Sequence, residues 1–301
     1  MATIFSHPSG ASLLSRIKNA FETKNIYRNR DFSIIFLCGG SVERRRRTMR
    51  KRFLKCIKSN HPNFLIILAE SVIEDIKEHC EPEFINLVKF ESLIGEISDC
   101  IMVFPESEGS IAEFGFFSGT GARKKVLVAN DINQQHDSFI NLGLVETNNN
   151  KSLFRPVMSM NYQGSDFTEI TRRLSDRLPQ KTRKKYTYKK FNEYDAQEKM
   201  FLIFQIIHIF KLLRTDDVIY CIRNFFGKSN IKEVKYILSI LTAANFIIRA
   251  SIDPEYFYPS SHVNPFYDFD NTDIGNIKAD VVQFLQKHHP ATYDILKEVS
   301  S

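Results

Sequence analysis

The chain lacks an apolar run of the roughly 20 residues that a membrane-spanning helix needs. Its most apolar stretch, FLIFQIIHIF at residues 201–210, contains Gln205 and His208 and is flanked by charge, which indicates a buried helix. The N-terminus has no basic region followed by an apolar core and a cleavage site, so it does not read as a secretory leader. We therefore expect a cytoplasmic protein without membrane contact.

Paired metal ligands are missing as well. The five cysteines form no CxxC pair: Cys38, Cys56, Cys80, Cys100 and Cys221. His61, His136 and His208 have no partners at the spacing of metal ligands. The segment from Ser118 to Ala122 has glycines but no Lys-Ser/Thr pair, so it is not a P-loop. We predict no disulfide, no metal site and no bound cofactor.

Positive charge is present in excess and is concentrated. The formal net charge is +6, and two basic blocks stand out, RRRRTMRKR at 44–52 and KTRKKYTYKK at 181–190. Such blocks commonly bind polyanions, although a solvated helix face and a charged linker are the alternative interpretation. In the second block, Tyr186 and Tyr188 alternate with basic residues, an arrangement that could clamp a nucleic-acid backbone and stack on its bases.

Four apolar runs alternate with helical patterns in the first half of the chain. They cover residues 32–38, 64–71, 100–105 and 125–130, the second of them stopping at Glu70. This alternation predicts a Rossmann-like α/β fold with a parallel sheet covered on both faces. Ligands bind at the carboxyl ends of the strands in such sheets. Gly39, Gly40, Glu70, Glu106 and the turn at 107–110 all lie at predicted strand ends.

The second half of the chain has a different pattern. We predict a first domain at 1–178, a basic linker at 179–194 and a second domain at 195–301. Three helices, the last one capped by Ser229-Asn230, precede two short strands around Asp253-Pro254, which is the order of a winged helix-turn-helix. Docking on a protein is the alternative role of this domain. The candidate nucleic-acid contacts are Lys184, Lys185, Lys189, Lys190, Lys232, Lys235 and Arg249.

The segment FPESEGSIAEFG at 104–115 follows the third apolar run and opens a helix that we expect from about Ile111 to Thr120. The turn before this helix suits a phosphate group, because free N–H groups and the helix dipole attract anions. Glu113 could attack an anomeric carbon, with Glu106 or Glu70 handling the proton of the leaving base. In the alternative interpretation, Ser110 and Glu113 form a capping box without catalysis.

This segment resembles the active-site segment of nucleoside deoxyribosyltransferase-like proteins. The motifs FLCGG at 36–40 and SFINLG at 138–143, and the order of elements after them, resemble the members of this group that bacterial retrons encode as effectors. The resemblance implies that Glu113 is the catalytic glutamate and that Glu106 belongs to the acidic turn of the active site. Together with the strand ends, it gives these candidate substrate contacts: Cys38, Gly39, Gly40, Glu70, Ser107, Gly109, Ser110 and Asn141.

The resemblance also implies a function. Such effectors are toxins that cleave N-glycosidic bonds, and a reverse transcriptase with its multicopy single-stranded DNA/RNA restrains them. The implied substrate is NAD or another nucleotide, and a homo-oligomer is expected, with SFINLG near its interface. The other hypothesis is a nucleotide-sensing, nucleic-acid-binding regulator without catalytic activity. Glu113 separates the two, because binding alone needs no carboxylate at the sugar.

Overall fold

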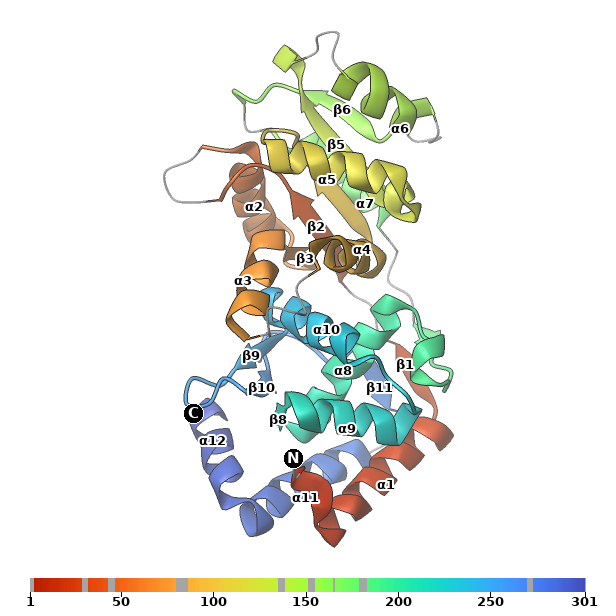
Figure 1. Cartoon of the computed structure of the whole chain (residues 1–301), viewed down its shortest axis with the longest axis vertical. Helices are drawn as coiled ribbons and strands as arrows, with labels where there is room; N and C mark the ends of the chain where they lie inside the picture. Colours follow the sequence, from red (N-terminus) through yellow and green to blue (C-terminus); the bar gives the residue numbers. More distant parts are fainter. Residues whose placement is uncertain are drawn as a thin grey trace. The chain divides into compact units, whose positions relative to one another are not determined.

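The structure is a computed structural model, and it describes residues 3–28, 32–42, 47–79, 86–134, 139–150, 155–164, 166–178, 183–269 and 273–300. The chain forms two compact units (Figure 1). The sheet unit comprises Asp31–Ile73 and Asn86–Gln180, and the helical unit comprises Met1–Arg30, Glu74–Ile85 and Lys181–Ser301. None of the described helices is long and apolar enough to cross a membrane.

The sheet unit contains five parallel strands, β2 (Ser33–Cys38), β3 (Phe64–Ile67), β4 (Cys100–Val103), β5 (Val126–Asp131) and β6 (Val157–Met160). Their order in the sheet is β3-β2-β4-β5-β6. The helices are α2 (Met49–Asn60), α3 (Ala69–His79), α4 (Leu87–Ile97), α5 (Glu108–Gly119), α6 (Glu146–Asn150) and α7 (Thr168–Arg177); α3 belongs to the other unit from residue 74 on.

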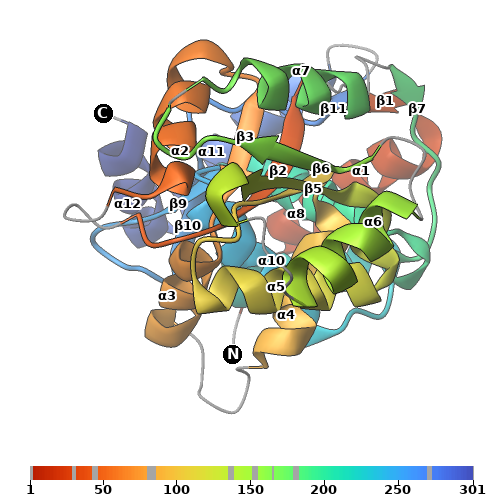
Figure 2. The ribbon, with the colours of Figure 1, turned by 90° about the horizontal axis from the view of Figure 1, so that it is seen from above.

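The sheet is apolar on both faces because helices cover both. Figure 2 shows α2 and α7 on one side of the sheet and α4 and α5 on the other. Ile35 and Leu37 pack in the core on the α2 side, with Phe53 and Leu174 from the helices. On the opposite side, the Phe36 ring meets Phe117 of α5 edge to face, with 5.8 Å between ring centroids. The predicted parallel sheet is confirmed.

The strand order fixes where a ligand site is expected. The chain moves from β2 outward to β3 and then returns to the other side of β2 at β4. The connections leaving β2 and β4 therefore diverge, and the crevice between their carboxyl ends is the usual binding position in open α/β sheets. The residues at these two ends are Cys38 and the turn that begins at Phe104.

The helical unit contains α1 (Pro8–Thr23), α8 (Ala196–Phe210), α9 (Thr215–Phe226), α10 (Ile231–Ala243), α11 (Asp273–His288) and α12 (Pro290–Ser300). It also has two antiparallel sheets. One has the order β11-β1-β7, with β1 (Ile26–Arg28), β7 (Lys184–Lys185) and β11 (Tyr267–Phe269), and the other has the order β8-β10-β9, with β8 (Leu213–Arg214), β9 (Ile247–Arg249) and β10 (Tyr256–Pro259).

Two segments lie in other surroundings than the sequence suggested. The expected scheme grouped α1 with the sheet, but its apolar stripe, which includes Leu14, Ile17 and Phe21, is buried in the helical unit, where α1 contacts α9 and α11. Residues 183–194 were expected to be a linker, but β7 pairs with β1 and Tyr194 is buried. Apolar and aromatic residues, not chain proximity, decide both placements.

Candidate active site

The turn after β2 approaches the start of α2 closely. A Cβ atom on Gly39 would lie 2.7 Å from Cβ of Arg50, and one on Gly40 would lie 2.7 Å from Cγ2 of Thr48. Real Cβ contacts are never that short, so both positions require glycine if α2 is to begin where it does. The FLCGG motif thus places the N-terminus of α2 at the carboxyl end of β2.

Glu106 holds these two parts together. Its carboxylate accepts hydrogen bonds from the backbone N–H groups of Gly40 (3.0 Å), Met49 (2.8 Å) and Arg50 (3.0 Å). The last two are orphan donors in the first turn of α2, where a carboxylate also interacts favourably with the helix dipole. Three backbone N–H groups thus occupy three of the roughly four acceptor positions of this carboxylate. The observed geometry suits positioning of the loop.

Arg50, from the first basic block, is buried in the same network. Its guanidinium donates to the carbonyl oxygen of Gly40 at 2.7 Å and forms a two-pronged ion pair with the Glu70 carboxylate. The Arg50 side chain is 5% exposed, and that of Glu70 is 44% exposed. Glu70 follows β3 directly but lies in the first turn of α3, so the predicted strand end at residue 71 is wrong by four residues. Residues 44–46 of the block lie outside the described residues.

The acidic turn is rigidly built. Helix α5 begins at Glu108 and not near Ile111, because Ser107 is its N-cap and Ser110 occupies the third position of a capping box. The Ser110 hydroxyl also accepts the backbone N–H groups of Glu106 and Ser107. The capping-box alternative for Glu113 is therefore wrong, since Ser110 closes the box itself. Gly109 lies in the first turn of α5, and no atom lies within 4 Å of the place where a Cβ atom would stand, so this position does not require glycine for lack of space.

Glu113 lies one turn further along α5 and faces the end of β2. The Cys38 thiol, 1% exposed at the last position of that strand, donates a hydrogen bond to the Glu113 carboxylate. Burial raises the pKa of Glu113 to about 7, the thiol lowers it in part, and the negative charge of Glu91 raises it further. Burial also raises the pKa of Glu91 on α4 and, together with Glu113, that of the Cys38 thiol.

This cluster is what the fold predicts for the α4/α5 side of the sheet. Side chains alternate along β2, so Cys38 shares its face with Phe36, which packs on α5. Two carboxyl groups from different helices thus converge on the strand end at the topological switch point. A carboxyl group with a pKa near neutrality and a second one nearby can carry out nucleophilic and proton-transfer steps.

Asn141 lies in a π-helical segment, Phe139–Val145, after β5. Its side-chain carbonyl accepts a hydrogen bond of 3.0 Å from Asn130, a buried residue of β5. Tyr162 also reaches this edge of the sheet, where its hydroxyl donates to the carbonyl oxygen of Ala129 at 2.6 Å. Burial raises the pKa of the Tyr162 hydroxyl most, and the nearby negative charges of Glu106 and Asp131 raise it further. The hydroxyl therefore stays protonated.

The lysines proposed to bind nucleic acid differ in exposure. Lys184, Lys185 and Lys190 are exposed and Lys189 is half-buried. The tyrosines between them are half-buried, and their hydroxyl groups have partners within the protein: the Tyr186 hydroxyl bonds that of Tyr194 at 2.6 Å, and the Tyr188 hydroxyl donates to the carbonyl oxygen of Phe225. Stacking of these two rings on bases stays a prediction, and the cationic side chains remain candidates.

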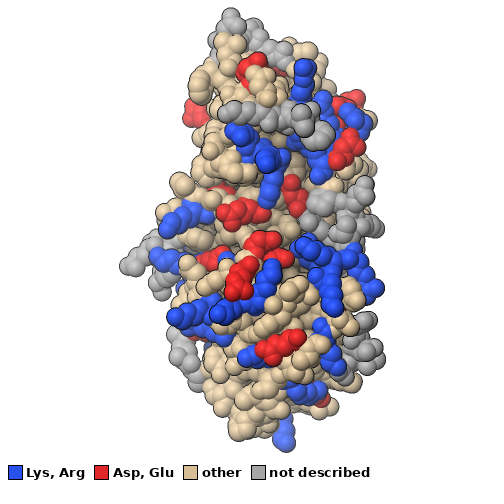
Figure 3. Space-filling model, turned by 90° about the vertical axis from the view of Figure 1, so that its right-hand side faces the viewer, with Lys and Arg blue, Asp and Glu red and all other residues tan. Residues whose placement is uncertain are grey.

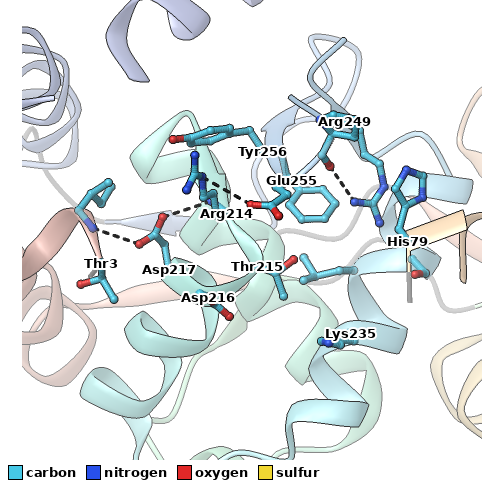
Figure 4. A pocket seen from close by; sticks show the side chains of 15 residues that line it. Thr3, His79, Arg214, Thr215, Asp216, Asp217, Lys235, Arg249, Glu255 and Tyr256 are labelled. Carbon is cyan, nitrogen blue, oxygen red and sulfur yellow. Dashed lines mark hydrogen bonds and ion pairs between the residues drawn. The ribbon is translucent and has the colours of Figure 1, made fainter. Parts of the chain in front are cut away.

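Residues predicted on the third helix and the wing line a cavity instead. Lys232 is exposed at the start of α10, but Lys235 and Arg249 border a cavity of about 470 Å³ between α9, α10 and the β9–β10 hairpin (Figure 4). Arg249 forms two bonds to the Asp75 carboxylate, at 2.8 and 3.0 Å, and lies 4.5 Å from the centre of the Phe257 ring. This guanidinium is already paired, so the predicted phosphate contact of Arg249 is not supported.

Sequence reasoning missed Arg50 and Glu91. Arg50 was hidden in a basic block, although its position in the first turn of the helix that follows Gly39-Gly40 could have marked it as a residue that turns back to the strand end. Glu91 was missed because the sequence alone does not show that its helix, α4, packs against β2. Burial of a carboxyl group has no signature in a single sequence.

The chain has recognisable relatives. The sequence profile of the family described as "STM3845 retron effector protein" matches residues 46–249. A retron Ec86 protein of Escherichia coli, whose name proposes a ribosyltransferase/DNA-binding protein, is 32% identical over 140 residues, which is 44% of this chain and 44% of that protein. The chain thus matches less than half the length of this relative. The profile match includes Arg50, Glu91, Glu106 and Glu113.

Proposed function

Because the chain belongs to the STM3845 retron effector family, we propose that it is an effector enzyme of anti-phage defence that cleaves the N-glycosidic bond of a nucleotide, with NAD as the substrate. The observation that carries this proposal is Glu113, a half-buried carboxyl group at the switch point of a parallel sheet, in contact with Cys38 and near a second carboxyl group. The ribosyltransferase name of the relative supports chemistry at an anomeric carbon.

In the proposed reaction, the Glu113 carboxylate attacks the anomeric carbon while the carbon–nitrogen bond breaks and its electron pair passes to the leaving base. The nitrogen of a nicotinamide riboside is positively charged, so it accepts the pair and leaves as a neutral base without a proton. Water then attacks the same carbon, and Glu113 is released. With water as the acceptor, the enzyme is a hydrolase. With another base as the acceptor, it is a transferase.

We assign the second carboxyl role to Glu91 instead of Glu106. Glu91 is near Glu113 and has no other charge partner among the described residues, so its carboxylate can take the proton from the attacking water. Glu106 is a positioning residue, because three backbone N–H groups occupy its oxygens. Gly109 and the first turn of α5 offer N–H groups for a phosphate, and Asn141 a side-chain amide.

We also propose that the helical unit binds the restraining nucleic acid, the single-stranded DNA of the retron with its reverse transcriptase. The order α8, β8, α9, α10, β9, β10 and the antiparallel sheet β8-β10-β9 support a winged-helix arrangement. Because most of α10 is buried, we place the nucleic acid on other residues than this helix. The DNA-binding name of the relative supports this partner.

The test compares nicotinamide release from NAD by the purified chain and by Glu113→Gln. We expect a loss of about 10³-fold or more, because glutamine keeps the size but cannot form the glycosyl bond. The matched control is Glu108→Gln, an exposed carboxylate of the same helix, which should keep full activity. A second assay follows NAD in cells that express the chain without its partner. NAD levels that fall equally with Glu113→Gln, or with neither protein, would favour the regulator hypothesis.

A further inference from the structure

A small hollow lies on the sheet β11-β1-β7 of the helical unit. It has a volume of about 60 Å³, and the residues that line it include four basic ones, Arg28, Lys184, Lys185 and Lys189, and one acidic one, Glu198. Tyr186, Thr187 and Tyr267 complete the lining. Arg28 comes from a strand more than 150 residues before β7, so only the fold brings these charges together.

The strand register explains why the charges meet. Arg28 on the central strand lies directly opposite Lys184 of β7 on one side and Tyr267 of β11 on the other. Side chains that are directly opposite share one face of a sheet, and like charges in such a pair destabilise it. Among the described residues, neither Arg28 nor Lys184 forms an ion pair, and only Lys189 lies near Glu198, at 4.0 Å. An anion bound between them would remove this repulsion.

The size of the hollow limits the anion. A hollow of about 60 Å³ holds only a few water molecules, which suits one phosphate group. Pockets for whole small molecules are several times larger. A larger ligand would therefore place one phosphate group in the hollow and keep its remaining atoms outside. Figure 3 faces the side of β1 and β7 and shows Lys and Arg side chains gathered at middle height near its right edge.

We propose that this hollow binds one phosphate group of a single-stranded nucleic-acid backbone, held between Arg28 and Lys184, with further charge from Lys185 and Lys189. The inference rests on the proposed function only in its choice of nucleic acid as the partner. It names the place of contact, which is a strand face and not the helix of a winged-helix motif. The partly buried Arg28 fixes the phosphate, and the exposed lysines follow the backbone.

The test measures binding of a fluorescent single-stranded DNA oligonucleotide by anisotropy between 50 and 300 mM salt, in the Glu113→Gln background. Lys184→Gln and Lys185→Gln should each reduce the slope of log K against log salt by about 0.7, which weakens binding about fivefold at 0.1 M salt. The matched control is Lys190→Gln, an exposed lysine of the same segment outside the hollow, which should change the affinity less than twofold.

Inorganic phosphate distinguishes the two sources of the anion. It should raise the melting temperature of the chain at millimolar concentration, and Lys184→Gln should abolish this rise. Protection by phosphate without an effect of Lys184→Gln on DNA affinity would mean that the hollow takes a free phosphate, which overturns the inference. Equal weakening by Lys190→Gln would mean diffuse attraction and would overturn it too. Because binding is measured without the nucleophile, failure of the glycosidase proposal leaves these outcomes unchanged.

Discussion

At the scale of single residues, the proposed chemistry depends on how the fold tunes Glu113. Burial raises its pKa to about 7, and the Cys38 thiol opposes part of this shift by donating a hydrogen bond to the charged form. A nucleophile must be ionised, so the ionised fraction of Glu113 increases as the pH rises through its pKa. Under the proposed function, its neighbours thus set the pH range of the reaction.

We predict that the rate of nicotinamide release rises with pH and reaches half of its plateau near pH 7, because Glu113 has its pKa there. Cys38→Ala removes the donor that favours the carboxylate, so the midpoint should shift to higher pH while the plateau stays within about tenfold. The measurement is kcat/KM between pH 5 and 9. A midpoint near pH 4.5 in both proteins would show that Glu113 is not desolvated in the free enzyme.

The residues that sequence reasoning identified are those with a local signature. Glu113 and the glycines of FLCGG lie in motifs whose spacing alone marks a strand end and a helix start. Arg50 and Glu91 have no such signature, because their roles depend on burial and on which helix crosses which face of the sheet. Glu106 was found, but its three backbone partners lie more than 50 residues earlier in the chain, so its task as a positioning residue was not apparent.

At the scale of elements, the start of α2 depends on a carboxylate from another segment. Its N-cap Thr48 accepts one backbone N–H, that of Lys51, whereas Met49 and Arg50 donate theirs to Glu106. This arrangement couples the turn after β4 to the turn after β2 and so keeps the two sides of the crevice at a fixed distance. The strand pattern in the sequence predicted both turns but not this link between them.

We predict that Glu106→Gln destabilises the chain by about 1–3 kcal/mol, because one amide NH₂ then faces buried backbone donors that lose their acceptor. Hydrogen–deuterium exchange of the peptide covering residues 47–54 should increase by at least tenfold. Glu108→Gln, the exposed neighbour, should change the free energy of unfolding by less than about 0.5 kcal/mol. An unchanged exchange rate in Glu106→Gln would show that Thr48 alone holds the helix start.

At the scale of the whole molecule, the order of the chain does not follow the order of the units. The strands β2 to β5 and the helices α8 to α10 were predicted, since apolar runs with helical or strand periodicity depend on local sequence, whereas α1, β6, α11 and α12 were not. The grouping of α1 with residues from 181 on was not predictable, because an amphipathic helix at the N-terminus carries no information about which apolar surface it covers. The grouping of residues 74–85 with the helical unit was not predictable either. This segment contains Asp75, whose carboxylate accepts a hydrogen bond from Arg249.

This interleaving makes the predicted first domain, residues 1–178, a poor choice for expression alone. Without α9 and α11, the apolar stripe of α1 with Leu14, Ile17 and Phe21 would face water. We predict that residues 1–178 aggregate and bind the dye ANS strongly, whereas residues 32–178, which lack α1, bind several-fold less dye. Sedimentation velocity and ANS fluorescence measure both. A monomeric 1–178 chain without dye binding would mean that α1 covers the sheet unit when the C-terminal part is missing, and that the two units can exchange this helix.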